Sequence, residues 1–334
     1  MKNIILSYDY ELFFGDRSGT VQKSLIEPTN QLMDAMESVG FRGNFFIDWQ
    51  MLKYLNLEED ELCQRDYISI VEQLKDMIRR GHRIELHIHP HWVDAKYNGD
   101  GTWNFDEFRH YSLNSFTKDE ITDMFVEGTN LLESIAREVE PDYKIIAFRA
   151  GGWAVQPFEL LKEGFIKAGI KIDSSPSPGF YIVNIHSTCD FRDMPNKTLY
   201  RFENDVCKED VTGEFICIPI TSYMRHIIQG AIEKITRKYT RRLRYMCDGT
   251  HNRKEDELAL KNGTLKQHSH SIRMLSFFTT PLCVPFIFYQ LRKKDLICVL
   301  QHPKDHTSYT CSVLKTFALF SNSLTYNDIY NGKW

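Results

Sequence analysis

The sequence predicts an α/β fold built around one hydrophobic core. Short apolar runs alternate with segments of helical periodicity through the first half of the chain, and unusual polar residues follow the apolar runs where strands would end. Strands that alternate with helices pair in parallel through right-handed crossovers. About seven strand candidates then predict a closed barrel or an open doubly wound sheet.

The first half of the chain carries the clearest elements. The expected strands are NIILSY, NFFID, RIELH, KIIAF and IKID, at residues 3–8, 44–48, 83–87, 144–148 and 170–173. The expected helices cover residues 28–39, 68–80, 117–138 and 157–169. Their ends carry the usual signals: Pro28 suits a first turn, Thr117 and Glu120 match a capping box, and Gly81 and Gly169 suit helix ends.

The second half is less regular. EFICIPI at 214–220 and LICVL at 296–300 are expected to form further buried strands. Residues 92–116 are rich in aromatics, Asn, Asp and Gly and predict a long loop, which in a compact domain is usually functional. Residues 241–273 are polar and fit no clear element. Because nothing marks a linker, we expect a single domain over residues 1–334.

The composition favours a soluble globular protein of a reducing compartment. A formal net charge of −4 gives no reason to expect nucleic acid as a partner. The eight cysteines include no CxxC pair, so reduced thiols are expected rather than a cysteine zinc site. The opening MKNIIL leaves no room for a signal peptide, and the apolar stretch at 274–289 is short and holds two prolines. We therefore expect a cytoplasmic protein without a transmembrane segment.

Polar residues suited to acid–base or metal chemistry fall at the carboxyl ends of the expected strands. In barrels and open α/β sheets these ends form the rim on which active sites are built. The residues are Asp9, Glu11, His87, Arg149, Asp173 and His302. Core packing does not readily explain six placements on one rim, so the sequence predicts an active site there.

The stretch GHRIELHIHPHW holds four of the twelve histidines. His87 and His91 are four positions apart, so one helical turn would bring both to one face. Together with a carboxylate from Asp9 or Glu11 they would form an open catalytic zinc site. The intervening proline biases His89 toward extended geometry. A fully extended stretch would put all three histidines on one face, which leaves a three-histidine site as an alternative.

These residues, in this order, resemble the motifs of the polysaccharide deacetylases, carbohydrate esterase family four. Ser7–Glu11 is similar to the family's Thr-Phe-Asp-Asp-Gly, and His87–His91 matches His-Ser/Thr-x-x-His. Arg149–Trp153 resembles Arg-x-Pro-Tyr without the proline, Asp173–Ser175 resembles the motif with a central Asp, and Leu300–His302 matches Leu-x-His. The resemblance runs over nearly the whole chain and implies a distorted (β/α)₇ barrel with a long loop inserted after the third strand.

The resemblance also implies a metal centre. His87 and His91 would bind a divalent metal, usually zinc. Tyr10 stands where the family has its second acid, so Glu11 is the expected third ligand and Asp9 the expected general base, although the two acids could exchange roles.

The remaining roles follow from the other motifs. The resemblance implies that His302 protonates the leaving amine and that Arg149 and Asp173 orient the base and the acid. From the sequence itself, a helix or turn cap is an equally good explanation of Asp173. Aromatic residues at the rim would contact the sugar. They are Trp92, Trp153 and Tyr10.

The activity expected from the resemblance is hydrolysis of an N-acetyl group on a sugar. A protein that stays in the cytoplasm would act on a nucleotide-linked or lipid-linked intermediate of lipopolysaccharide or another surface glycan. The basic run Lys234–Tyr245 could hold a diphosphate or touch an anionic membrane, or be a solvated helix face. Alternatives are a metal-dependent amidase acting on a non-sugar amide and a degenerate member that binds glycan without turnover.

Overall fold

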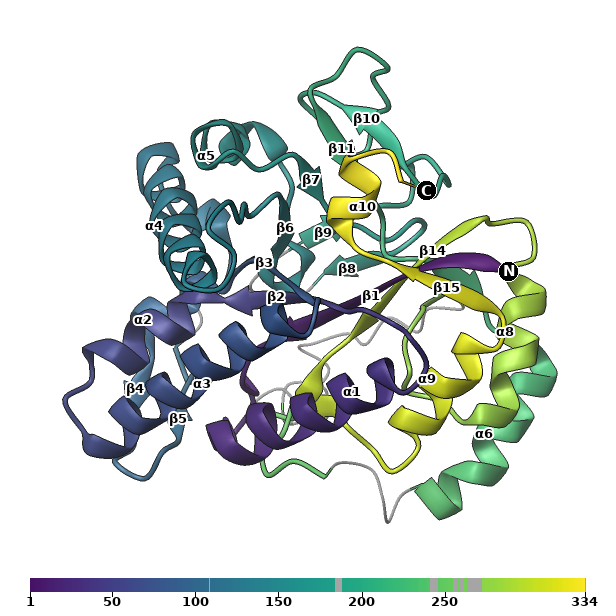
Figure 1. Cartoon of the computed structure of the whole chain (residues 1–334), viewed down its shortest axis with the longest axis horizontal. Helices are drawn as coiled ribbons and strands as arrows, with labels where there is room; N and C mark the ends of the chain where they lie inside the picture. The colour runs from purple at the N-terminus through teal and green to yellow at the C-terminus, as the bar shows by residue number, and fades with distance from the viewer. Residues whose placement is uncertain are drawn as a thin grey trace.

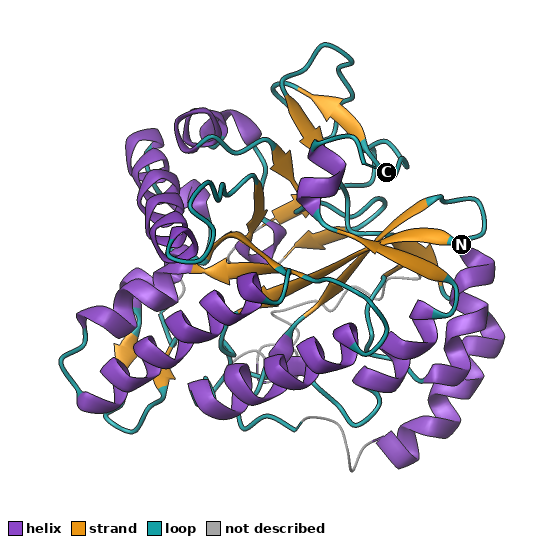
Figure 2. Ribbon diagram, in the orientation of Figure 1, coloured by secondary structure: helices purple, strands orange, loops and turns teal. Residues whose placement is uncertain are grey.

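A computed structural model describes residues 1–107, 109–183, 188–240, 246–254, 258, 261–262 and 272–333. Within this part of the chain a nine-stranded sheet runs through the molecule, in the order β10-β11-β7-β6-β3-β2-β1-β14 with β15 paired to β1. Its strands are β1 (Lys2–Tyr10), β2 (Asn44–Asp48), β3 (Arg83–Ile88), β6 (Ala147–Ala150), β7 (Ile172–Asp173), β10 (Tyr200–Phe202), β11 (Phe215–Cys217), β14 (Leu296–Gln301) and β15 (Ser321–Leu324). Every pairing is parallel except that of β10 with β11. The α/β class is confirmed (Figure 2).

Helices cover the outer face of this sheet, and one short helix, α10, packs on its inner face. They are α1 (Glu27–Glu37), α2 (Trp49–Leu57), α3 (Glu61–Arg79), α4 (Lys118–Arg137), α5 (Lys162–Ala168), α6 (Ile227–Thr240), α8 (Val284–Gln290), α9 (Thr310–Ala318) and α10 (Tyr326–Tyr330). Figure 1 shows α4 and α5 side by side next to β6 and β7, and α1, α9 and α8 in a row beside β1 and β14. In the described residues, no helix combines the length and the apolar character that crossing a membrane requires.

Short elements connect the main ones. Three two-stranded sheets are β4 (Lys96–Tyr97) with β5 (Trp103–Asn104), β8 (Tyr181–Val183) with β9 (Thr188–Asp190), and β12 (Ser222–Met224) with β13 (Ile272–Met274). Single-turn helices are η1 (Gln22–Ile26), η2 (Pro90–Asp94), η3 (Leu113–Ser115), η4 (Gly151–Trp153), η5 (Phe158–Leu160), η7 (Pro281–Cys283) and η8 (Pro303–Asp305). The expected long loop at 92–116 therefore contains the β4–β5 hairpin, the end of η2 and the whole of η3.

The sheet curls so that its two ends approach each other. After β11, the chain continues toward β14, where the Thr221 amide donates to the Cys298 carbonyl and the Thr221 hydroxyl accepts from the Cys298 amide. The Leu300 amide then donates to Leu275. These bonds give the sheet the form of a partly closed barrel, and the seven-unit barrel with an insertion stays a prediction.

Side chains alternate between the two faces of the curled sheet. In β1, Ile4, Leu6 and Tyr8 belong to the large core under the helices, whereas Ile5 belongs to a second cluster on the inner face. Ser7 and Asp9 have the same parity as Ile5, so they also lie on the inner face. Tyr326 of α10 reaches this face and donates from its hydroxyl to Ser174. The interior thus changes from apolar at the amino ends of the strands to polar and charged at their carboxyl ends.

The positions of the four expected helices were predicted correctly, and the residues at which they begin and end were predicted less accurately. The Thr117–Glu120 capping box begins α4 as expected, and Gly169 ends α5 in a left-handed conformation. The expected helix at 68–80 begins seven residues earlier, at Glu61, with Asp60 as its cap. Helix α2 was not predicted, because its nine residues WQMLKYLNL continue directly from a strand without a turn signal. Most of the unassigned region 241–273 lies outside the described residues.

Candidate metal centre and its rim

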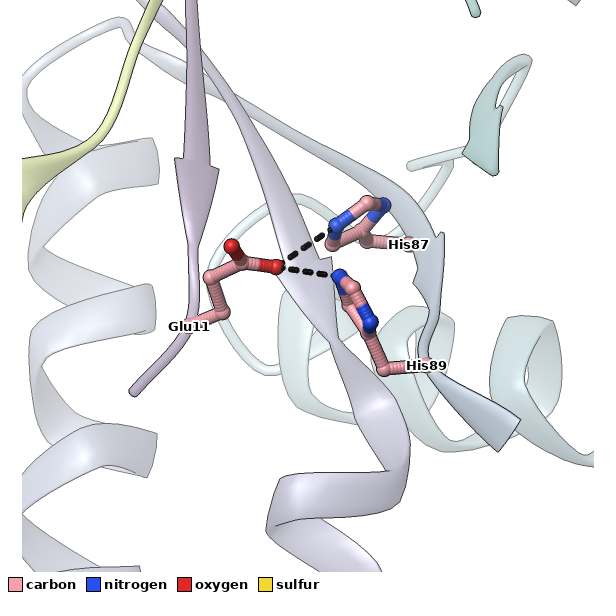
Figure 3. Close-up of side chains that lie close together, drawn as sticks. All are labelled: Glu11, His87 and His89. Carbon is pink, nitrogen blue, oxygen red and sulfur yellow. Dashed lines mark hydrogen bonds and ion pairs between the residues drawn. The ribbon is translucent and has the colours of Figure 1, made fainter. Parts of the chain in front are cut away.

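Three buried side chains converge at the carboxyl ends of β1 and β3 (Figure 3). Glu11, His87 and His89 each offer a ligand atom, and these atoms lie within 4.8 Å of one another. Both imidazoles approach the same carboxylate oxygen, Glu11 Oε2, from 2.9 Å for His87 Nε2 and 2.6 Å for His89 Nε2. Two imidazole nitrogens and one carboxylate are the donor set of an open divalent-metal site. The residues present therefore fit such a metal.

Backbone contacts orient both histidines. The Nδ1 of His87 donates to the carbonyl of Arg149 over 2.7 Å, which directs its Nε2 toward Glu11. His89 packs against Gly151, where an added Cβ would lie only 2.6 Å from His89 Nδ1 and from the Ile88 carbonyl. The glycine in the sequence Arg-Ala-Gly-Gly thus lets the backbone pass close to a histidine.

This trio differs from the expected one at a single position. His89 is two positions after His87 in an extended segment, so both side chains point to the same face. His89 therefore lies on the inner face beside Glu11. Pro90 then begins the η2 turn and carries His91 away from that line. His91 is fully buried and packs on Phe14 and Tyr111, with its ring centre 5.2 Å from that of His89. Its role as a ligand stays a prediction, and His89 takes the third position in the structure.

Charges around the trio set its protonation. Burial alone would raise the pKa of Glu11, but Lys304, His89 and His87 hold that pKa well below the usual carboxyl range. For His87, the neighbouring Asp9 and Glu11 outweigh burial and raise the pKa to about 9. Burial dominates for His89 and lowers its pKa. Without a metal, these neighbours favour the ionised carboxylate of Glu11 and the protonated imidazole of His87, and burial favours the neutral imidazole of His89.

Asp9 lies beside the trio and is held by Arg149. The guanidinium of Arg149 is fully buried and donates from Nη1 to Asp9 Oδ1 over 2.5 Å. It also donates to the Ser174 carbonyl and to the Ser7 hydroxyl, and it lies 4.3 Å from the Phe46 ring. The expected pairing of Arg149 with the aspartate is present, and the second oxygen of Asp9 remains directed toward His302.

His302 completes the rim from β14. Its Nε2 lies 3.6 Å from Asp9 Oδ2 and 3.5 Å from Glu11 Oε1. Its Nδ1 pairs with Asp305 Oδ2 at 3.0 Å, and the other Asp305 oxygen meets His251 Nε2 at 2.6 Å. Burial lowers the pKa of His302, but Asp305, Asp9 and Glu11 raise it above its usual value. With 19% of its side chain exposed, compared with 5% and 6% for Asp9 and Glu11, His302 lies nearest to solvent.

The expected role of Asp173 is not supported, because its side chain lies on the other face of the sheet. Asp173 pairs in register with Phe148, which packs outward against Phe125 of α4. Its carboxylate accepts from the Ser175 hydroxyl over 2.6 Å, and burial raises its pKa to about 7. Among the described residues, Asp305 rather than Asp173 is the carboxylate that orients His302.

Two of the three expected sugar contacts are inaccessible. Tyr10 is fully buried on the outer face and donates to Gln73 of α3. Trp92 is also fully buried and donates to Asp48 over 2.6 Å. Both side chains therefore serve packing. Trp153 is partly exposed beside Phe180, and its contact with a sugar stays a prediction.

Sequence reasoning missed two further charged residues at this rim. Lys304 is 1% exposed and donates to Glu11 Oε1 over 2.8 Å. Asp48 ends β2, pairs in register with His87, and keeps one carboxylate oxygen without a hydrogen-bond partner in the described residues. Burial raises the pKa of Asp48 to about 7. The only signal for Asp48 was its place at the end of a strand, the same signal that singled out Asp9.

Comparisons with known proteins give a fold likeness only. The chain matches no family model and no curated protein. A proposed polysaccharide deacetylase from Mycobacterium smegmatis is 12% identical over 99% of this chain and 89% of its own, with a TM-score of 0.47. A 4-alpha-glucanotransferase from Thermococcus litoralis is also 12% identical, over 100% of this chain and 40% of its own, with a TM-score of 0.48. A pseudoenzyme of carbohydrate esterase family four from Bacillus anthracis is 9% identical, over 98% and 64%, with a TM-score of 0.40. At TM-scores below 0.5 these likenesses carry no conclusion about function.

Proposed function

We propose that this protein is a metal-dependent carbohydrate N-deacetylase. The observation that carries the proposal is the meeting of three units at one rim: the Glu11–His87–His89 trio, Asp9 held by Arg149, and His302 held by Asp305. Hydrolysis of an amide needs an activated water, a base and an acid that protonates the departing nitrogen. The sequence motifs that resemble those of the polysaccharide deacetylases contain candidates for the same three functions: metal ligands that activate the water, a base and an acid.

Glu11, His87 and His89 would hold the metal, and their two nitrogens and one oxygen suit Zn²⁺. When bound, a divalent cation supplies Lewis-acid polarisation of a carbonyl and lowers the pKa of water. His91 remains a candidate ligand through a local change in the η2 turn.

Asp9 and His302 face each other across the rim and would divide the proton transfers. Arg149 occupies Asp9 Oδ1, so Asp9 Oδ2 is the oxygen that can accept a proton from water. Asp305 accepts from His302 Nδ1, so a proton on His302 Nε2 can be donated to the leaving nitrogen. Asp305, Asp9 and Glu11 raise the pKa of His302 above its usual value, which favours the imidazolium form required of an acid.

For the substrate we propose an N-acetyl sugar linked to a nucleotide or a lipid, as an intermediate of lipopolysaccharide or another surface glycan made in the cytoplasm. All eight cysteines are free, which favours a reducing compartment. Helix α6 exposes Ile227 and Ile228 in its first turn and Ile235 within the basic run, a combination that fits peripheral membrane contact. The side chains of that run from residue 237 on lie outside the described residues.

The test is acetate release from nucleotide-linked N-acetyl sugars by the zinc-loaded protein. The proposal predicts equal amounts of acetate and new primary amine, both abolished in Asp9→Asn. Release from non-sugar amides alone would favour the amidase alternative.

One observation favours a second candidate, a degenerate member that binds glycan without turnover. The Lys304 ammonium already compensates the charge of Glu11, as a metal would. This candidate predicts glycan binding without acetate release and without bound metal.

A further inference from the structure

Lys304 is a buried ammonium beside the candidate metal site. It is 1% exposed and has two hydrogen-bond acceptors, Glu11 Oε1 at 2.8 Å and the Leu12 carbonyl at 2.6 Å. The faces of Phe13 and Phe14 lie 5.4 and 4.7 Å from its nitrogen. A charge is rarely buried this completely without a partner of opposite charge, and Glu11 is that partner.

The two oxygens of Glu11 serve different neighbours. Oε2 meets the imidazoles of His87 and His89, and Oε1 meets Lys304. Lys304 therefore fixes the carboxylate by one oxygen and leaves the other oriented toward the two histidines.

Three acidic side chains of the rim already have a cationic partner without a metal. Asp9 pairs with Arg149, Glu11 with Lys304, and Asp305 with His302. A divalent cation held by Glu11 would add positive charge next to an ammonium that is only 1% exposed. Charges a few ångströms apart in a poorly hydrated site repel strongly enough to change an affinity at least about tenfold.

We propose that Lys304 is a positioning residue that keeps Glu11 in its ligand geometry in the metal-free protein and weakens the binding of the metal. This inference rests on the proposed function, since it requires a metal at the trio. The metal would accordingly be exchangeable rather than permanently held. A merely structural role makes the opposite prediction, because loss of packing around Glu11 would weaken metal binding.

The experiment measures zinc affinity by competition with a chelator at pH 8, for the wild type, Lys304→Met and Lys304→Gln. Gln keeps a hydrogen-bond donor for Glu11 without the charge. Lys75→Met is the matched control, since Lys75 is a lysine of α3 that pairs with Glu72 and Glu138 away from the rim. We expect both Lys304 variants to bind zinc at least about tenfold more tightly than the wild type, and the control to be unchanged.

Thermal unfolding gives a second readout. Removing one partner of a buried pair destabilises the fold, so the Tm of metal-free Lys304→Met should fall by about 5 °C and recover when zinc is added. If neither Lys304 variant can be obtained folded even from zinc-supplemented cultures, the proposal is wrong, because zinc should replace the lost charge.

The outcomes separate this inference from the proposed function. Tighter zinc binding in the variants supports Lys304 as a weakening residue. Zinc binding in the variants alone supports that role of Lys304 and overturns the metal-dependent function of the wild type. Unchanged or weaker binding, with one equivalent of zinc in the wild type, overturns the inference and leaves the proposed function standing. Absence of zinc binding in every protein overturns both.

Discussion

Arg149 and Asp9 form an ion pair on the inner face of the sheet, with 2.5 Å between Nη1 and Oδ1 and the guanidinium fully buried. The two residues are 140 positions apart in sequence, on β6 and β1. Their pairing links the candidate general base to the interior polar layer of Ser7 and Ser174.

Arg149→Met should remove both stability and activity. It leaves Asp9 buried without its cation, so the free energy of unfolding should fall by about 3–5 kcal/mol, and kcat per folded molecule should fall about 100-fold. Arg83→Met is the matched control. Arg83 pairs with buried Glu85 at the opposite end of β3, so this variant should lose comparable stability and keep its kcat. Urea unfolding and acetate release measure the two quantities. Equal kcat in both variants would exclude a role for Arg149 beyond stability.

Asp305→Asn should impair the acid, whereas Asp173→Asn should not. Asp305 raises the pKa of His302, and the protonated imidazole is the active form of an acid. Without that carboxylate the pKa of His302 falls, so activity should be lost at a lower pH on the alkaline side of the profile. We expect kcat near neutral pH to fall about 100-fold. The measurement is a pH–rate profile of the wild type and both variants. If the alkaline limb of the profile moved in Asp173→Asn and not in Asp305→Asn, Asp173 would be the residue that orients His302, as the sequence predicted.

Asp173 should make stability depend on pH. Burial raises its pKa from 3.8 to about 7 in the folded protein. The folded state therefore keeps a proton that the unfolded state has released, and this stabilisation is complete below about pH 4 and is lost as the pH rises through about 7. Relative to the wild type, Asp173→Asn should become more stable by on the order of 4 kcal/mol over that interval. Urea unfolding at several pH values measures the difference, and a constant difference would contradict the buried, protonated carboxyl.

Gly151→Ala should disturb the trio through His89. The added Cβ would meet His89 Nδ1 and the Ile88 carbonyl at 2.6 Å, and such overpacking costs about 1–3 kcal/mol. Zinc affinity should fall as the imidazole is displaced. Gly230→Ala in α6 is the control, since its nearest neighbour would lie 3.6 Å away and alanine favours a helix. Equal zinc affinity in the two variants would show that His89 does not need its present position.

Much of the fold and part of the site could be predicted because both follow from strand periodicity. Apolar runs located the central strands, and polar residues at their carboxyl ends located Asp9, Glu11, His87, Arg149 and His302. The same reasoning failed for Asp173 and Tyr10, since a shift of one residue in a strand moves a side chain to the opposite face.

Other features had no local signal. The turn at Pro90 decides that His89 rather than His91 approaches Glu11, and a Pro in this position is compatible with either arrangement. Lys304 and Asp305 look like an ordinary polar turn after a strand. Their roles arise from contacts with Glu11 and His302, and the Lys304–Glu11 contact spans 293 residues of the sequence.

The most direct test of the metal-dependent hydrolase is metal content by mass spectrometry after reconstitution with zinc. We predict about one equivalent in the wild type, none in His87→Ala/His89→Ala, and retention in the His91→Ala control, in agreement with the ligand trio. Absence of metal in the wild type would contradict the metal-dependent mechanism and favour the glycan-binding protein. If His91→Ala lost the zinc and a His89→Ala variant kept it, His91 rather than His89 would be the third ligand.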